Sequence, residues 1–377
     1  MSPNAPLRIV HCFRAPVGGV FRHVRDLIDA QIAAGHIVGV VCDATTGSAF
    51  EEQRLADLQP KLALGLQRVE MRRRVGPGDV LAALRTYRLI GKLRPDILHG
   101  HGAKGGVYAR LFGTWLRWTG NRTARFYSPH GGSLHYDAGK LTGRAIFAIE
   151  RWIEPMTDRI IFVSGFERAT YIRKVGEPRC RSVLIHNGLA ERDFEPLPAN
   201  DPAADFLFIG EMRYLKGPDI FIDALARAGQ ASGRRLTGIM VGDGRDRTSL
   251  MQSANAGGAA AIEFRLPMAA RDAFQLARVV VIPSRAESLP YILLEALAAG
   301  RPVIASRVGG IPEILGADSP ALIEPNADRL AAKMLELLAD PDTFQRHLPD
   351  ITTLKRSFSV NSMAARMESE YYEALNS

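Results

Sequence analysis

Short apolar runs alternate along the chain with amphipathic stretches of helical period. The run at 7–12 predicts a strand, and Val17-Gly18-Gly19-Val20 opens a helix that extends to about Ala34, where Gly35 is a stop signal. The next apolar run, at 37–42, predicts a second strand. Strands that alternate with helices are typical of parallel α/β structure, in which helices cover both faces of the sheet.

The alternation continues to the end of the chain with one interruption. Further strands are predicted at 97–99, 125–128, 160–164 and 182–186 and, after the Pro-rich segment 195–202, at 206–209, 237–241, 262–265, 279–283 and 303–305. A series that restarts within 377 residues predicts two Rossmann-like, doubly wound domains, which we place at 1–198 and 199–356. The segment 357–377 carries a last helical pattern and is expected to return to the first domain.

Charge is unevenly divided between the halves. Residues 1–195 contain 29 Lys and Arg against 18 Asp and Glu, a net charge of +11, whereas the whole chain has +8. A basic first half could face nucleic acid, an anionic bilayer or a phosphorylated lipid, or be a solvated surface without a partner. The three cysteines suggest neither a disulfide framework nor a metal pair, and no apolar run reaches the length of a membrane span, so the expected location is cytoplasmic.

The densest chemical signal lies at 279–314. A buried strand ends at Pro283, Glu287 follows in a loop, and Pro290 begins a helix that is apolar on nearly every side. Glu295 lies within that helix, where a carboxylate without a donor would cost several kcal/mol. Hydroxyl groups such as a ribose diol would satisfy it, and so would an arginine of the same domain.

These residues resemble the retaining GT-B glycosyltransferases of family 4, which carry two Glu separated by seven residues, as Glu287 and Glu295 are. The resemblance implies two Rossmann-like domains facing across a cleft, with Glu287 on the hydroxyls of a donor sugar and Glu295 on the nucleotide ribose. Pro290 ends the stretch where the family commonly has Gly-Phe-Gly and offers no backbone N–H. Amide donation is therefore expected from Leu289 and Tyr291.

A second signal, at 206–225, is a strand that leads into Gly210, followed by a loop with Arg213 and Lys216. Ligands of open α/β sheets bind at the carboxyl ends of strands, so these cations are placed for a diphosphate. The family has an Arg and a Lys in this loop for that purpose. Glu211 stands where its Arg usually follows the Gly, so Lys216 matches the family's pattern better than Arg213 does.

Two further turns match the family in the first half. Gly18 and Gly19 lie at the first strand-to-helix turn, where glycines and a helix N-terminus favour a phosphate. His130, in the sequence Ser-Pro-His-Gly-Gly, follows another strand. The resemblance places it beside the donor sugar, near the reacting carbon; a structural hydrogen-bonding role is the alternative.

Two motifs point to other chemistry and are excluded. The segment 100–105 matches the dinucleotide fingerprint G-x-G-x-x-G, but no acidic residue follows at the required distance, so no NAD is expected. The sequence Asp340-Pro341-Asp342 resembles a metal-binding Asp-x-Asp but lies at a helix end. No metal or cofactor is therefore predicted, and the donor is a substrate.

The resemblance to family 4 implies retaining transfer of a sugar from a UDP- or GDP-sugar to an acceptor hydroxyl, and no metal is expected in it. A lipid-linked saccharide on an anionic membrane surface is the expected acceptor, with no nucleic acid partner. The membrane expectation rests on the charge, on Arg72-Arg73-Arg74 and on 107–118, where Leu111, Trp115 and Trp118 share a helical face. The alternatives are an epimerase or phosphorylase of the same fold and a non-catalytic membrane- or RNA-binding protein.

Overall fold

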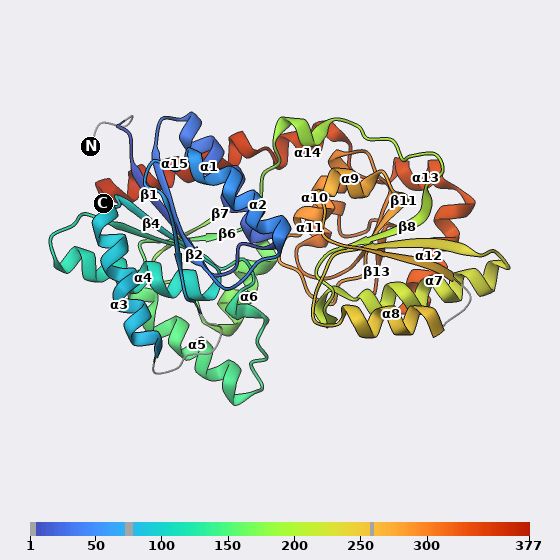
Figure 1. The fold of residues 1–377 in the computed structure, drawn as a ribbon, viewed down its shortest axis with the longest axis horizontal. Helices are drawn as coiled ribbons and strands as arrows, with labels where there is room; N and C mark the ends of the chain where they lie inside the picture. The colour runs from blue at the N-terminus through green and yellow to red at the C-terminus, as the bar shows by residue number, and fades with distance from the viewer. Residues whose placement is uncertain (1–4, 72–77, 257–259) are drawn as a thin grey trace. The chain divides into compact units, whose positions relative to one another are not determined.

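The computed structural model describes residues 5–71, 78–256 and 260–377 and divides the chain into two compact units (Figure 1). The first unit comprises Met1–Gly188 and Val360–Ser377, and the second comprises Leu189–Ser359. The Pro-rich segment 195–202 runs within the second unit, because Leu197 N donates to Ala299 O at 3.0 Å and Asn200 N donates to Gln275 O at 2.8 Å. The division thus falls before this segment, between Gly188 and Leu189.

The first unit is built on a seven-stranded sheet with the order β3-β2-β1-β4-β5-β6-β7, and every neighbouring pair is parallel. Its strands are β1 (Arg8–Phe13), β2 (Ile37–Asp43), β3 (Leu66–Val69), β4 (Ile97–His101), β5 (Ala124–Ser128), β6 (Arg159–Phe162) and β7 (Arg181–Leu184). Its α-helices are α1 (Gly18–Ala33), α2 (Ala49–Leu58), α3 (Gly78–Leu93), α4 (Gly102–Trp118), α5 (Leu141–Ile153), α6 (Gly165–Lys174) and α15 (Val360–Asn376).

The second unit repeats this plan with a six-stranded parallel sheet of order β10-β9-β8-β11-β12-β13. Its strands are β8 (Ala204–Ile209), β9 (Leu236–Val241), β10 (Ala260–Arg265), β11 (Ala277–Ile282), β12 (Val303–Ser306) and β13 (Leu322–Ile323). Its α-helices are α7 (Pro218–Ser232), α8 (Arg247–Ala256), α9 (Ala270–Phe274), α10 (Tyr291–Ala298), α11 (Ile311–Leu315), α12 (Ala327–Ala339), α13 (Pro341–Arg346) and α14 (Ile351–Ser357). The prediction of two doubly wound α/β domains is confirmed.

Alternation along the strands assigns side chains to the two faces of the first sheet. Ile9 and Ile97 belong to the apolar cluster that Tyr371 of α15 completes, whereas Val10 and Leu98, one residue further on, face the cluster formed with α4. Because both faces are covered by helices, the strands are apolar on both sides and appear in the sequence as continuous apolar runs.

The last helix, α15, packs on the first unit beside α1 (Figure 1). Met363, Met367 and Tyr371 bury their side chains against the strands. Glu370, on the same helix, accepts from Arg159 Nε of β6 at 3.0 Å and from Arg181 Nη2 of β7 at 2.8 Å. The apolar face therefore supplies the burial, and the ion pairs fix the register of the helix on the sheet.

Membrane spans were sought among the helices of the described residues. None of these helices combines the length with the apolar character that crossing a bilayer requires.

Candidate functional site

In the second unit, Lys216 and Glu287 form a close ion pair although they lie far apart in the sequence. Lys216 Nζ donates to both carboxylate oxygens of Glu287, at 2.7 and 2.9 Å. Ser284 Oγ donates to Glu287 Oε1 at 2.7 Å, and its residue is 1% exposed. Glu287 itself is 7% exposed, and the Lys216 side chain is 25% exposed. The pair thus has a buried acidic side and a more accessible cationic side.

Two loops meet to make this pair. The short 3₁₀ turn Tyr214–Lys216 follows β8, and Gly217 after it has φ +66°. A Cβ on Gly217 would lie 2.1 Å from the carbonyl oxygen of Pro283, at the end of β11, so only glycine permits this approach. Arg285 N also donates to Leu215 O at 2.8 Å, which joins the two loops through the backbone. Neighbouring parallel strands therefore deliver Lys216 and Glu287 to the same sheet edge.

The helix after Glu287 begins as predicted. Pro290 is the N-cap of α10, Tyr291 is its first residue, and Leu289 and Tyr291 are each 5% exposed. Glu295 lies on α10 and is half-buried, among neighbours that are mostly fully buried.

Gly210 and Arg213, the other predicted residues of this unit, already make protein contacts. Gly210 N donates to Val241 O at 3.0 Å, so this amide is engaged within the sheet. Arg213 Nε lies 2.8 Å from Glu211 Oε2. Glu211, which stands where the family usually has its Arg, thus pairs with the nearest arginine.

In the first unit, Gly18 and Gly19 are exposed at the start of α1. Gly18 has φ +60°, and a Cβ there would meet no atom within 4 Å. The residue before the helix, Val17, makes no side-chain cap, and the first turn contains no acidic residue. This helix end therefore has the features that suit an anion.

His130 lies in the turn after β5 and has φ +49°, a conformation that costs energy for a residue with a side chain. The turn is held by Glu167, whose Oε1 accepts from Gly131 N and whose Oε2 accepts from Val163 N at 2.9 Å. Burial, with the neighbouring His23 adding to it, lowers the pKa of His130 well below its usual value. The ring is thus neutral at physiological pH and can act as a hydrogen-bond donor and acceptor.

His130 belongs to a cluster of five histidines that the sequence analysis did not recognise. His11 is on β1, His99 and His101 are on β4, and His23 is on α1. His11 pairs with His99 in register, and His99 and His101 are two residues apart, so the three rings project from the same face. The sequence signal is three histidines inside apolar strands, where a charged side chain would be costly.

The ring nitrogens of this cluster are close enough to raise the question of a metal. Those of His11, His99 and His101, and those of His23, His101 and His130, lie within 4.8 Å of one another. His11, His99 and His101, however, each use both ring nitrogens in hydrogen bonds to other side chains. The arrangement fits a hydrogen-bonded network better than a ligand set.

The excluded motifs have structural explanations. The glycines at 100–105 allow α4 to approach the sheet, because a Cβ on Gly105 would lie 2.2 Å from Cys12 O and one on Gly100 would lie 2.4 Å from Gly105 O. Asp340 caps α13, accepting from Thr343 N at 3.0 Å. Both motifs therefore serve packing and helix capping.

The helical face at 107–118 is not the apolar surface that we expected. Leu111 and Trp115 pack against the core cluster of α3 and α4, with the Trp115 ring 5.5 Å from that of Tyr87, and Trp118 is 75% exposed. The exposed apolar surface lies instead on α5, where Leu141, Ile149 and Trp152 are 81%, 53% and 69% exposed. Arg72-Arg73-Arg74 falls outside the described residues.

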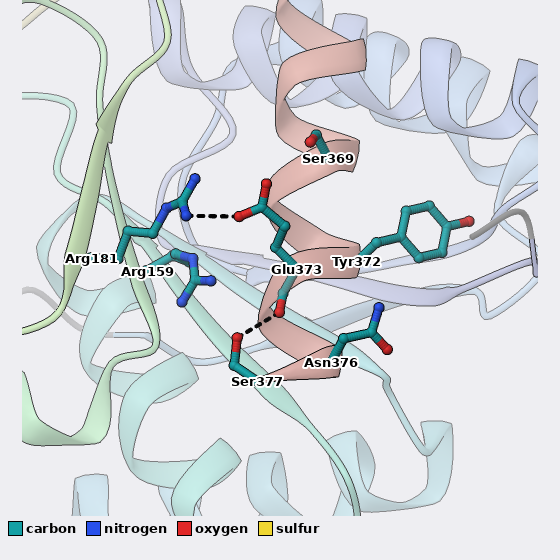
Figure 2. A pocket seen from close by; sticks show the side chains of 7 residues that line it. All are labelled: Arg159, Arg181, Ser369, Tyr372, Glu373, Asn376 and Ser377. Carbon is teal, nitrogen blue, oxygen red and sulfur yellow. Dashed lines mark hydrogen bonds and ion pairs between the residues drawn. The ribbon is translucent and has the colours of Figure 1, made fainter. Parts of the chain in front are cut away.

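A hollow of about 500 Å³ lies beside α15 and is not lined by these residues (Figure 2). Arg159 and Arg181 point into it, and both are paired with carboxylates of α15. It is shallow and its charges are satisfied, so we assign it to the docking of the helix.

Family models, curated relatives and solved structures all match this chain. The "Glycosyltransferase Family 4" model matches residues 17–191, and the "Glycosyl transferases group 1" model matches 203–340. A glycogen synthase of Mycobacterium tuberculosis is 27% identical over 88% of this chain and 84% of its own, and a D-inositol 3-phosphate glycosyltransferase of Thermobispora bispora is 26% identical over 89% and 81%. Among solved structures, Anabaena HepE in complex with UDP and glucose superposes with a TM-score of 0.77 at 15% identity, covering 98% of this chain and 100% of its own.

The fold is that of the GT-B glycosyltransferases. Since the two models together match well over half of the chain, and relatives match nearly all of it, the chain belongs to glycosyltransferase family 4 and is a glycosyltransferase.

Proposed function

We propose that this glycosyltransferase moves a sugar from a UDP- or GDP-sugar to an acceptor hydroxyl with retention of configuration and without a metal or cofactor. The observation that carries the proposal is the pair of Lys216 and Glu287, supported by Ser284, at the carboxyl edge of the second sheet. The name of the Mycobacterium tuberculosis relative and the UDP bound to HepE agree with such a donor.

In this proposal the leaving diphosphate is stabilised in the second unit by Lys216, assisted by Arg213. In the first unit, the start of α1 at Gly18 and Gly19 is proposed as an anion site in its own right. Departure of the diphosphate from the anomeric carbon is the costly event, and preorganised donors lower its barrier. Glu287 accepts from hydroxyls of the donor sugar while holding Lys216 in place. His130 lies beside the reacting carbon.

Glu295 accepts hydrogen bonds from the ribose hydroxyls, and Leu289 and Tyr291 line the nucleotide through their backbone. Gly210, whose amide is bonded to Val241 O, leaves space beside the nucleotide and does not donate to it. A half-buried carboxylate on an apolar helix suits a diol, which neutralises no charge but supplies two donors.

The donor can be tested without knowing the acceptor. Thermal shifts with UDP-, GDP- and ADP-sugars should single out one base, because a ligand at 100 times its Kd stabilises by about 2.7 kcal/mol. Slow hydrolysis of that donor should fall roughly tenfold or more in Glu287→Gln, which removes a charged acceptor. Glu336→Gln on α12 is the matched control, since Glu336 forms an exposed ion pair with Lys333 of the same helix.

The test has two contradicting outcomes. The donor assignment fails if no nucleotide sugar shifts the unfolding temperature at millimolar concentration. Turnover that needs inorganic phosphate, or that yields an isomerised donor, would instead identify a phosphorylase or an epimerase.

We further propose that the acceptor is a lipid-linked saccharide and that the first unit reaches it by docking on an anionic membrane through α5. Leu141, Ile149 and Trp152 lie along one exposed stripe of this helix, and Lys140 and Arg144 beside them are also exposed. An apolar stripe flanked by cations suits the headgroup region of an anionic bilayer. The net charge of +11 over residues 1–195 has the matching sign.

Vesicle flotation checks this surface. The protein should float with phosphatidylglycerol vesicles at about 50 mM salt and detach towards 500 mM, as screening requires. The double variant Ile149→Ser and Trp152→Ser should bind roughly tenfold or more weakly, since each large apolar side chain contributes about 1.5–3 kcal/mol on burial. Trp118→Ser, which removes an exposed tryptophan from α4, should bind like the parent. Equal loss in both variants, or no flotation at low salt, would contradict docking through α5.

A further inference from the structure

A chain of hydrogen bonds connects His130 with the interior of the first unit. His130 Nε2 lies 3.0 Å from His101 Nδ1, and His101 Nε2 lies 2.9 Å from His11 Nδ1. His11 Nε2 in turn lies 2.8 Å from the Oε1 atom of Gln31 on α1. Three imidazoles thus link a half-buried turn to a buried carboxamide.

The three rings are neutral, which makes their protons interdependent. Burial lowers the pKa of His11 to about 4 and lowers the pKa values of His101 and His130 well below their usual value. A neutral imidazole has one N–H and one lone pair, so donation at one nitrogen requires acceptance at the other. The ring nitrogen that carries the proton in His11 therefore determines which nitrogen carries it in His101 and His130.

Gln31 fixes the direction of this chain. Its Oε1 can only accept, so His11 is protonated on Nε2 and accepts on Nδ1 from His101 Nε2. His101 then accepts on Nδ1 from His130 Nε2. His130 is left with an unprotonated Nδ1, which has no hydrogen-bond partner within residues 5–71, 78–256 and 260–377.

A second branch continues from the amide nitrogen of Gln31. Gln31 Nε2 donates to the Tyr371 hydroxyl at 3.4 Å, and this hydroxyl lies 2.8 Å from His99 Nδ1. His99 Nε2 lies 2.8 Å from Ser128 Oγ. In this orientation Gln31 donates to Tyr371, Tyr371 donates to His99, and His99 donates to Ser128. Turning the Gln31 amide around would reverse every proton and leave His130 with an N–H at Nδ1.

We propose that Gln31 and Tyr371 are positioning residues that set the tautomer of His130 through His11 and His101, so that His130 offers the lone pair of Nδ1 to a hydroxyl of the donor sugar. The role towards the sugar rests on the proposed function. The tautomer does not, because it is a property of the free protein. Through Tyr371, the C-terminal helix α15 helps to set the tautomer of His130 as well as packing on the sheet.

The tautomer can be read directly by two-bond ¹H–¹⁵N NMR of histidine-labelled protein near pH 7. We expect His11, His101 and His130 to be neutral and protonated on Nε2. In Gln31→Met, which removes the acceptor, His130 should become a mixture of tautomers. Tyr372→Phe is the matched control on the same helix, because Tyr372 OH donates to Ala5 O and not to the network; it should leave the spectrum unchanged.

Kinetics separate the relay from the proposed function. Gln31→Met should lower kcat/KM for the donor roughly tenfold while leaving the affinity for the free nucleoside diphosphate unchanged, because only the sugar contact is lost. A His130 protonated on Nδ1 in the parent protein, or tight zinc binding that displaces the ring protons, would overturn the relay. The expected tautomers with unaltered kinetics in Gln31→Met would leave the network in place and refute its role towards the sugar.

Discussion

Replacing Lys216 with alanine is expected to lower the rate of sugar transfer by about 10²–10³-fold, the effect of removing one preorganised donor to a developing negative charge. Affinity for the nucleoside diphosphate should fall roughly 10- to 100-fold with the loss of a charge-assisted contact. Affinity for the nucleoside alone should not change, since the contact proposed for Lys216 is with the phosphates. Calorimetric titration with the nucleoside and its diphosphate measures the difference.

Two controls make this result specific. Lys333→Ala removes another lysine of the second unit, one whose partner is Glu336 on the same helix, and should bind both ligands normally. Lys216→Ala also leaves Glu287, which is 7% exposed, without its counter-ion, so its unfolding temperature should be recorded in parallel. An equal loss of nucleoside and diphosphate binding in a folded variant would refute the phosphate role of Lys216.

Mild acid is expected to destabilise the first unit strongly. Burial lowers the pKa values of His11 and His23 from 6.5 to about 4, whereas in the unfolded chain both titrate near 6.5. The unfolded state therefore binds more protons between these values, and the free energy of unfolding falls as the pH is lowered from 6.5 to about 4. At about 1.4 kcal/mol per pKa unit, each of the two contributes a loss of roughly 3 kcal/mol.

The groups that surround the His11 and His23 rings support the expected loss of stability in acid. His11 contacts His99 and His101, and His23 contacts His101 and His130 and is also influenced by His11. None of these is a carboxylate that could stabilise an imidazolium. Burial would raise the carboxyl pKa of Asp158, but Arg125 and Arg117 outweigh it and lower this pKa below 3.8. The stability that the ionised Asp158 contributes is therefore lost only at a more acidic pH than the stability lost through the histidines.

The measurement can be confined to the first unit. All three tryptophans, Trp115, Trp118 and Trp152, lie there, so the fluorescence of urea-unfolding curves at pH 7 and pH 4.5 reports that unit. A His11→Gln variant should lose less stability than the parent between the two conditions. An unfolding free energy that stays constant down to pH 4.5 would mean that the histidines are not held neutral.

The sequence predicted every strand of the two sheets except β3 and β13, each of which lies at an edge of its sheet. Continuous apolar runs identify the inner strands because helices cover both faces. The edge strands β3 (Leu66–Val69) and β13 (Leu322–Ile323) were not predicted. β3 contains Gln67 and Arg68 and is only half-buried, and β13 has two residues, so neither has a recognisable period.

Loop residues tied to a motif were also predictable, but their partners were not. Glu287 and Lys216 were found as separate candidates, each at a strand end. That they form one pair depends on β8 and β11 being neighbours in the sheet, which strand order alone decides.

By itself, the sequence determined the fold class, the family resemblance and the residue types at the strand ends, since these depend on local period and short motifs. Only the tertiary structure decided that Leu111 and Trp115 face the core while α5 exposes its apolar stripe, because a helical period does not say which face is covered. It alone also brought His11, His101 and His130 into contact with Gln31 and Tyr371. These residues span positions 11 to 371, and no local pattern records hydrogen bonds between groups so far apart in the chain.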